Sequence, residues 1–383
     1  MATASAKLKI GFVLDDSLDT PDGVQQYVLA LSNWLRAQGH DVHYLVGETG
    51  RTDIKNVHSL SRNVKVRFNG NRMSMPLPAN KTKIAAILAR EQFDILHVQM
   101  PFSPFMAGRV IAAAPRSTAV VGTFHIAPNS PLVTAANHGL RWLTRATLKR
   151  FDQIMAVSPI AQTFARQTFG IESQIVPNLV DLKPFINAKP LPQYTGDEPV
   201  VLFLGRLVER KGCQHLLSAV AKLHRENAEL PCKVVVCGKG PLEPRLKIYA
   251  QEHNIGHMVE FTGFITESDK PRYMASADIA VFPSTGGESF GIVVVEALGA
   301  ARGAVLAGNN PGYASVMGSH TEALFKPTDT AALSAKLLEL LSDKAKRDQA
   351  RKWQRQDAGR FDTPVVGKQV LAQYTTALRK RRA

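Results

Sequence analysis

Short runs of apolar residues alternate with amphipathic segments along the first part of the chain. The run Leu8 to Leu14 ends at Asp15 and Asp16, as expected of a strand buried on both faces of a parallel sheet. From Val24 to Arg36 apolar residues recur at helical spacing, and another apolar run follows at Val42 to Val46. This order predicts a β-α-β unit.

The same pattern returns further along the chain, where short apolar runs end in small or polar residues. These runs are Ile95 to Val98, Ala119 to Phe124, and Gln153 to Val157. A doubly wound parallel sheet is the expected arrangement of such strands.

A proline-rich stretch, Lys183 to Pro199, separates this series from a second one and is predicted to be a linker. The second series predicts further strands and helices at Val200 to Leu204, Cys213 to Glu226, Lys233 to Cys237, Asp278 to Phe282, and Ala304 to Ala307, with closing helices at Ala331 to Leu341 and Val365 to Leu378. The chain is therefore expected to be an α/β protein with two Rossmann-like halves. Ligands are expected at the carboxyl ends of the strands, in a cleft between the halves.

Length and charge sharpen this interpretation. A chain of 383 residues exceeds what one hydrophobic core usually supports, which favours two domains. The net charge of +15 indicates an anionic partner: nucleic acid, an anionic membrane or phosphorylated small molecules. Residues 54–90 contain eight lysines and arginines and no acidic residue, so we expect this segment to face something negative.

Other classes are disfavoured by what the sequence lacks. No apolar run reaches the roughly 20 residues needed to span a bilayer, and Met1 to Lys9 does not resemble a secretory signal. We therefore expect a cytoplasmic protein. Three scattered cysteines fit neither a disulfide framework nor a zinc motif.

The segment with the most specific chemistry is Gly286 to Leu298, which lies between a predicted strand and a predicted helix. Its two carboxylates, Glu288 and Glu296, stand eight positions apart, with Glu288 on the loop and Glu296 on a helix expected to begin near Phe290. Backbone N–H groups of such a loop can hold a diphosphate. The alternative is a glycine loop with two solvated glutamates.

This segment resembles the E-x7-E motif of family 4 of the retaining glycosyltransferases, and its G-G-E-S-F-G-I run resembles phosphatidylinositol mannosyltransferases. The likeness extends over most of the chain, through Pro21 to Gln25, Arg67 to Gly70, Asp94 to His97, Thr123 to His125, Ala156 to Ser158, Val176 to Asn178, and Leu202 to Arg206.

The resemblance implies a GT-B fold, in which two Rossmann-like, doubly wound domains face each other across a cleft. Residues 1–185 would form the acceptor-side domain and residues 186–360 the nucleotide-sugar donor domain. Residues 361–383 would form a C-terminal helix that crosses back to pack on the N-terminal domain.

The family's donor site can be carried over by residue. Arg206 and Lys211 match the basic pair that neutralises the donor diphosphate, while Gly23 matches a glycine that lets backbone approach the phosphates. Asp22 departs from the second glycine common there, and it can cap the helix instead. Glu296 matches the ribose-binding residue, and Glu288 matches the residue that contacts hydroxyls of the transferred sugar. The remaining donor positions implied are Phe290, Gly291 and Ile292.

No metal site is implied, because Arg206 and Lys211 carry the positive charge and no Asp-x-Asp pair is present. No cofactor is therefore expected beyond the nucleotide sugar, while stimulation by magnesium stays open. His125 matches a histidine near the reacting carbon that orients the sugar. In such enzymes the leaving phosphate itself is thought to accept the proton of the acceptor, so His125 is grouped with Glu288 as catalytic but not as a general base.

Ile265, Glu267 and Lys270 align with positions around the nucleotide base. A carboxylate can accept from guanine N1–H and N2–H together, which favours GDP-mannose over a UDP-sugar. Glu267 as an exposed loop residue is the alternative.

On the acceptor side Phe68 and Asn69 match the mannosyltransferases, whereas Gln99 and Met100 replace a His-Glu pair of relatives. In the helix-like run from Leu140 to Arg150, basic side chains recur every four residues, at Arg141, Arg145 and Lys149. Such a helix can lie on an anionic bilayer, or it can be a solvated face that covers the core.

Together these features predict a retaining hexosyltransferase. Our leading hypothesis is transfer of mannose to a phosphorylated polyol or glycolipid by a protein peripheral to the inner face of the plasma membrane. A glycosyltransferase with a soluble acceptor and a UDP-sugar is the alternative. A nucleic-acid binder would leave the segment from Glu288 to Glu296 without a purpose, so no nucleic-acid partner is expected.

Overall fold

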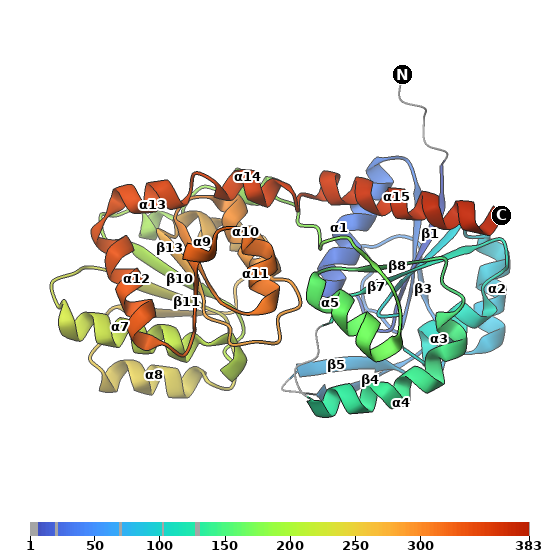
Figure 1. Ribbon diagram of the computed structural model, residues 1–383, viewed down its shortest axis with the longest axis horizontal. Coiled ribbons are helices and arrows are strands. Elements are labelled where there is room, and N and C mark those ends of the chain that lie inside the picture. The colour runs from blue at the N-terminus through green and yellow to red at the C-terminus, as the bar shows by residue number, and fades with distance from the viewer. Residues whose placement is uncertain (1–6, 20–21, 69–70, 102, 127–130, 383) are drawn as a thin grey trace, which may run out of the picture. The chain divides into compact units, whose positions relative to one another are not determined.

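The protein divides into two compact units, each with its own sheet (Figure 1). Unit 1 comprises Met1–Leu179 and Thr363–Ala383, and unit 2 comprises Val180–Asp362. The computed structural model describes residues 7–19, 22–68, 71–101, 103–126 and 131–382.

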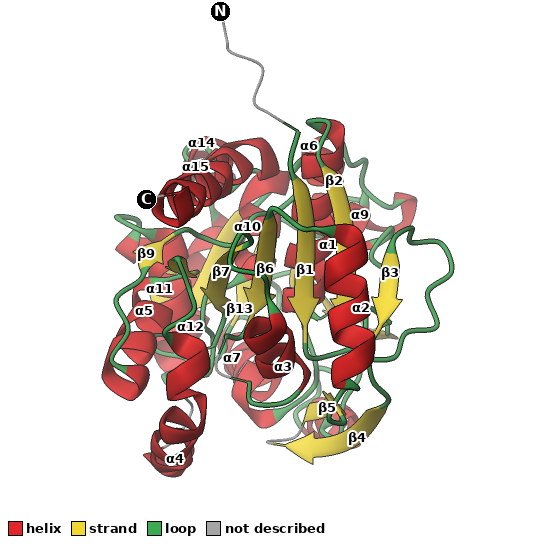
Figure 2. Ribbon diagram, turned by 90° about the vertical axis from the view of Figure 1, so that its right-hand side faces the viewer, coloured by secondary structure: helices red, strands yellow, loops and turns green. Residues whose placement is uncertain are grey.

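Unit 1 contains a seven-stranded parallel sheet in the order β3-β2-β1-β6-β7-β8-β9. The strands β3, β2, β1, β6 and β7 can be followed side by side in Figure 2. Its strands are β1 (Lys9–Leu14), β2 (Asp41–Val46), β3 (Val57–Ser59), β6 (Ile95–Gln99), β7 (Ala119–Phe124), β8 (Gln153–Ala156) and β9 (Gln174–Ile175). The helices between them are α1 (Gly23–Ala37), α2 (Lys81–Glu91), α3 (Met106–Ala113), α4 (Pro131–Leu148) and α5 (Pro159–Phe164), and a separate antiparallel hairpin is formed by β4 (Asn63–Phe68) and β5 (Asn71–Pro76).

Successive residues of each strand point to opposite faces of the sheet, and both faces are buried. Phe12 of β1 packs with Tyr27 and Leu31 of α1 on one face. Val13 and Leu45 pack on the other face, in the cluster that includes residues of α2 and α3. This double burial explains why the strands are uniformly apolar rather than alternating.

The last helix, α15 (Thr363–Arg382), belongs to unit 1 although it follows unit 2 in the chain (Figure 1). Val366, Val370 and Tyr374 are fully buried in the core that β1 and α1 share. Burial of each valine contributes about 2 kcal/mol before the entropy of ordering is counted. The expectation that the C-terminal helix packs back on the N-terminal domain is confirmed.

Unit 2 contains a six-stranded parallel sheet in the order β12-β11-β10-β13-β14-β15. The strands are β10 (Val200–Leu204), β11 (Lys233–Cys237), β12 (Val259–Gly263), β13 (Ile279–Phe282), β14 (Ala304–Gly308) and β15 (Leu324–Phe325). The helices are α6 (Lys183–Ile186), α7 (Cys213–Glu226), α8 (Glu243–Glu252), α9 (Lys270–Ser276), α10 (Ile292–Ala300), α11 (Pro311–Met317), α12 (Thr330–Ser342), α13 (Lys344–Ala350) and α14 (Gln354–Gly359). Two Rossmann-like units are thus present, as predicted.

The prediction that Lys183 to Pro199 form a linker is partly wrong. Lys183 to Ile186 form α6, with Pro184 in the first turn, where a missing N–H costs nothing. Tyr194 is buried, and its hydroxyl donates to Glu260 at 2.7 Å. This segment therefore packs as part of unit 2.

No helix among the residues described combines the length and the apolar character that crossing a bilayer requires.

Candidate active site

In unit 2 the loop after β13 brings Glu288 against two cations. Oε1 of Glu288 lies 2.8 Å from Lys211 Nζ, 2.8 Å from a guanidinium nitrogen of Arg210, and 2.9 Å from the donating hydroxyl of Ser284. Burial alone would raise the pKa of Glu288, but Lys211 and Arg210 outweigh it and hold the pKa below its usual range. The carboxylate is therefore charged at neutral pH, next to two positive groups that a phosphate can bind.

A glycine lets these two loops come together. Lys211 ends a 3₁₀ turn, and Gly212 follows it with φ 78°, a left-handed conformation at the start of α7. A Cβ at Gly212 would collide with the carbonyl oxygen of Pro283. The Thr285 N–H donates to the Arg210 carbonyl at 2.9 Å, and the single proton of Ser284 Oγ, 2.9 Å from the same oxygen, is shared between it and Glu288, so the two loops are fixed to one another.

A second charged cluster lies at the start of α9. Lys270 Nζ is 2.7 Å from Glu296 Oε1 and 2.6 Å from Glu267 Oε2. Lys270 and Glu296 are buried, whereas the Glu267 side chain is 51% exposed. Burial would lower the pKa of Lys270, but Glu296 and Glu267 raise it above its usual value. The ammonium stays charged and fixes both carboxylates, one inside and one facing solvent.

The rest of the E-x7-E segment shapes the loop between the two clusters. The helix begins at Ile292 rather than near Phe290, because Gly291 at φ 128° turns the chain just before it. Glu296 is the fifth residue of the nine-residue helix α10. Phe290 is buried against Phe361, with ring centroids 5.2 Å apart, and Ile292 is half-buried.

The remaining predicted donor residues lie at strand ends or helix starts. Arg206 is exposed just after β10, and Ile265 is half-buried just after β12. Gly23 is the exposed first residue of α1 in unit 1. Asp22 occupies the N-cap position of that helix, but its side chain makes no capping hydrogen bond, so the proposed capping role is wrong.

His125 lies just after β7 in unit 1 and is buried. Its Nε2 lies 2.7 Å from Gln99 Oε1, and the Gln99 amide nitrogen donates to the His97 carbonyl at 3.4 Å. Because an amide oxygen only accepts, Nε2 carries the proton and Nδ1 keeps its lone pair. Burial lowers the pKa of His125 to about 3, so the ring is neutral at pH 7.

Acid groups also gather near the start of α1. Asp15 accepts from the Ala107 N–H at 2.7 Å and from the Ser103 hydroxyl, while Asp16 accepts from the Gln25 amide at 3.0 Å. Burial raises the pKa of Asp15 and of Asp16 to about 6. These contacts hold the loop that leads from β1 towards Gly23.

The residues predicted to meet the acceptor and the membrane lie on β4, just after it in the sequence, and on or just beyond α4. Phe68 is the last residue of β4, opposite Asn71 in the hairpin, and Asn69 lies outside the described residues. On α4 and just beyond it the basic side chains are exposed, and Trp142 and Leu143 are 78% and 62% exposed. The basic residues concerned are Arg141, Arg145 and Lys149.

Sequence reasoning missed three residues that hold the predicted ones. Arg210 stands beside Lys211 in the sequence, so the doubled cation was a visible signal. Gln99 was noticed only as a departure from relatives, yet it orients His125. Ser284 gave no signal, because only the fold brings its hydroxyl to Glu288.

Comparison with known proteins identifies the family. Residues 21–184 match the family described as Glycosyltransferase Family 4, and residues 189–357 match Glycosyl transferases group 1. A phosphatidyl-myo-inositol mannosyltransferase of Propionibacterium freudenreichii is 32% identical, over 97% of this chain and 95% of the relative. The chain belongs to glycosyltransferase family 4.

A second relative of this family 4 glycosyltransferase has a similar sequence identity. A phosphatidyl-myo-inositol mannosyltransferase of Mycolicibacterium smegmatis is 30% identical over 96% of this chain and 94% of its own length. Among solved structures, a glycosyltransferase from Rickettsia africae superposes with a TM-score of 0.77 at 19% identity, covering 98% of this chain and 100% of that one. The predicted GT-B fold and the predicted class, a retaining glycosyltransferase, are confirmed.

Proposed function

We propose that this enzyme transfers mannose from GDP-mannose to a phosphorylated polyol or glycolipid at the cytoplasmic face of the membrane. The observation that carries the proposal is the identity of 30–32% to phosphatidyl-myo-inositol mannosyltransferases over nearly the whole chain. The charged clusters of unit 2 supply groups of the kind that such a donor requires.

For the donor diphosphate we propose binding by Arg206 and Lys211. The Lys211 ammonium group is paired with Glu288 in the structure, so a bound diphosphate would share the ammonium group with that carboxylate. Glu288 would then accept hydrogen bonds from hydroxyls of the transferred sugar. Two fixed cations can neutralise the leaving diphosphate without a divalent ion, so no cofactor is required, although magnesium could still assist.

For the nucleoside we propose that Glu296 accepts from the ribose hydroxyls and that Glu267 pairs with guanine. The half-exposed Glu267 carboxylate is held by Lys270 through one oxygen, Oε2. A carboxylate can accept from guanine N1–H and N2–H, whereas uracil offers one N–H between two carbonyls. Ile265 would contribute apolar contact to the base, and Phe290, Gly291 and Ile292 would shape the phosphate loop.

For catalysis we propose attack by the acceptor hydroxyl on the face from which the phosphate leaves. The bond from the anomeric carbon to the phosphate oxygen breaks as the bond to the acceptor oxygen forms, and the acceptor proton passes to the leaving phosphate. His125, neutral and oriented by Gln99, would position the sugar. Gly23 would allow backbone to approach the phosphates.

For the acceptor we propose a membrane surface met by α4. Exposed Trp142 and Leu143 beside Arg141, Arg145 and Lys149 combine apolar insertion with attraction to anionic lipid. Each basic residue near such a surface contributes about 1 kcal/mol. Phe68, the last residue of β4, and Asn69, which follows it in the sequence, are the proposed acceptor contacts.

A soluble acceptor with a UDP-sugar donor is the second candidate, and it rests on one departure from the family resemblance. In the resemblance described above, Gln99 and Met100 of this chain take the place of a His-Glu pair, so the acceptor side departs from the pattern of the phosphatidylinositol mannosyltransferases.

One transfer assay separates these candidates. The purified chain is incubated with GDP-mannose or UDP-glucose, and with vesicles containing phosphatidylinositol or with soluble inositol phosphate, and products are identified by mass spectrometry. We expect a mannosylated lipid from GDP-mannose and vesicles. Transfer to inositol phosphate from UDP-glucose would establish the alternative.

A further inference from the structure

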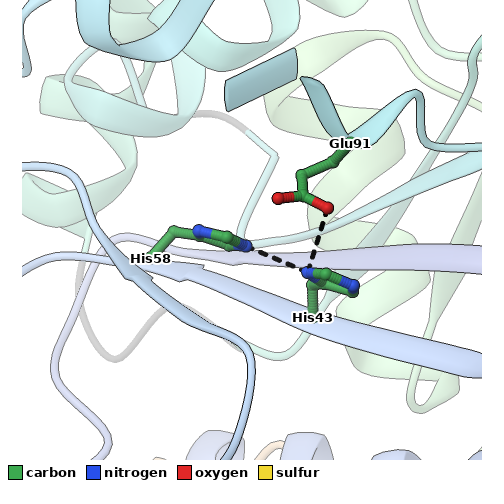
Figure 3. A group of neighbouring side chains, drawn as sticks. All are labelled: His43, His58 and Glu91. Carbon is green, nitrogen blue, oxygen red and sulfur yellow. Dashed lines mark hydrogen bonds and ion pairs between the residues drawn. The ribbon is translucent and has the colours of Figure 1, made fainter. Parts of the chain in front are cut away.

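Two histidines and a glutamate of unit 1, His43, His58 and Glu91, point towards one another (Figure 3). His43 lies on β2, His58 lies on the edge strand β3, and Glu91 is the last residue of α2. His43 Nδ1 is 2.9 Å from His58 Nε2 and 3.9 Å from Glu91 Oε2. In the part of the chain that the structure describes, this is the one group of such side chains whose ligand atoms all lie within 4.8 Å.

These distances fit a tetrahedral ion. With metal–ligand bonds of about 2.0–2.1 Å, ligand atoms of a tetrahedral zinc site lie about 3.3 Å apart. The two measured separations, 2.9 Å and 3.9 Å, lie on either side of that value. All the ligand atoms of the three side chains lie within 4.8 Å of one another, so the side chains must close in on the ion that they share.

Asp41 supplies the outer support that metal-binding histidines usually have. Its Oδ1 lies 3.2 Å from His43 Nε2, so Nε2–H donates to it and the Nδ1 lone pair faces the cluster. His58 Nε2 then donates to His43 Nδ1, and an ion would displace that one proton. Burial lowers the pKa of both rings, which leaves them neutral, as metal ligation requires.

The ammonium group of Lys9 already contacts two carboxylates of this cluster. Lys9 Nζ lies 2.7 Å from Glu91 Oε2 and 4.0 Å from Asp41 Oδ2. An incoming ion would compete with the ammonium for the same carboxylate oxygen, and Lys9 could move towards Asp41. The cluster therefore has a built-in competitor whose removal is predicted to strengthen metal binding.

We propose that His43, His58 and Glu91 form a site for a divalent transition-metal ion, with zinc the best fit and a fourth position left for water. Two imidazoles and one carboxylate suit zinc, whereas magnesium and calcium take mainly oxygen ligands. His58 and Glu91 bracket residues 59–90, which include the basic hairpin and α2. A bound ion would fasten both ends of that segment to the sheet.

The test is calorimetric titration of the full chain with zinc chloride, after removal of metal with chelator and without a histidine tag. We expect one ion per chain, and a loss of affinity well above tenfold in His58→Gln and in Glu91→Gln. Asp41→Asn should cost about tenfold, since it removes only the outer support. Lys9→Met should bind zinc more tightly than the parent chain.

A matched control is His257→Gln, because the His257 ring lies edge-on to His224 in unit 2, with centroids 5.4 Å apart, and among the described residues no third metal-ligating side chain joins this pair. That variant should bind zinc like the parent. Cobalt should give visible bands of a tetrahedral nitrogen and oxygen site, without the sulfur charge-transfer band that the cysteines would produce. His58→Gln tests the proposal even if Glu91→Gln fails to fold, since melting curves in chelator will show which variants are intact. No zinc binding, equal affinity in His58→Gln, or a thiolate spectrum would overturn the proposal.

Discussion

The ammonium group of Lys211 lies 2.8 Å from the carboxylate of Glu288. The residue proposed to bind the donor diphosphate and the residue proposed to bind the donor sugar therefore form an ion pair with each other. Because each holds the other in place, neither can be removed without disturbing the site. We expect Lys211→Ala and Glu288→Ala each to lower kcat/KM by at least roughly 100-fold, while the fold is kept. Initial rates with GDP-mannose measure this, and circular dichroism checks the fold.

The control for this prediction is Lys222→Ala on α7, which breaks an exposed ion pair with Glu226 in the same unit. An exposed pair of this kind contributes less than about 1 kcal/mol, so activity should stay near that of the parent. Near-normal turnover in Lys211→Ala or Glu288→Ala would contradict the proposed donor site.

Glu267→Ala tests the choice of nucleotide. Loss of a hydrogen-bonded charged partner usually costs about 1.5–3 kcal/mol, so GDP affinity should fall by roughly 10- to 100-fold while UDP affinity hardly changes. Competition binding with the two nucleotides measures the ratio, and Glu252→Ala on α8 serves as the exposed control. If GDP and UDP affinities fell together, Glu267 would have no part in base selection.

The α4 face gives a prediction about membranes. Replacing Arg141, Arg145 and Lys149 by Ser should weaken sedimentation with anionic vesicles, and Trp142→Ser should remove a blue shift of fluorescence on binding. A control variant with Lys222, Lys247 and Lys346 replaced by Ser loses the same charge from unit 2. Equal sedimentation of both triple variants would mean that α4 is merely a solvated face.

His97 makes unit 1 sensitive to acid. It is fully buried between Tyr374 Oη at 2.8 Å and Thr123 Oγ1 at 2.7 Å, and burial lowers its pKa from 6.5 to about 3. The unfolded chain therefore takes up a proton below pH 6.5 that the folded chain refuses, so the stability from neutral His97 is lost as pH falls.

The expected loss is about 2 kcal/mol between about pH 7.5 and about pH 5. His97→Gln keeps hydrogen-bonding groups but does not titrate, so the gap in the free energy of unfolding between parent and variant should shrink by that amount. Urea unfolding followed by tryptophan fluorescence measures it at both pH values. A gap that does not change with pH would show that His97 does not titrate as described.

The sheets could be predicted from sequence because their central strands are apolar on both faces. The runs that became β1, β7 and β10 stand out for that reason. The edge strand β3 and the two-residue strands β9 and β15 were missed, since so few residues, half of them exposed or polar, carry no pattern.

The site was predictable where residues lie close in sequence. Glu288, Glu296 and the neighbouring glycines form one motif, and its loop could be placed from flanking strand and helix patterns. His43, His58 and Glu91 could not be grouped, because their meeting depends on the register of β2 with β3 and on where α2 ends.

The most direct test of the proposed donor site is calorimetry of the purified chain with GDP, UDP and ADP in parallel. We expect clear preference for GDP, and loss of that binding in Lys211→Ala. Preference for UDP would contradict GDP-mannose as donor and favour the soluble-acceptor alternative, whereas binding of none of the three would contradict the donor site in unit 2.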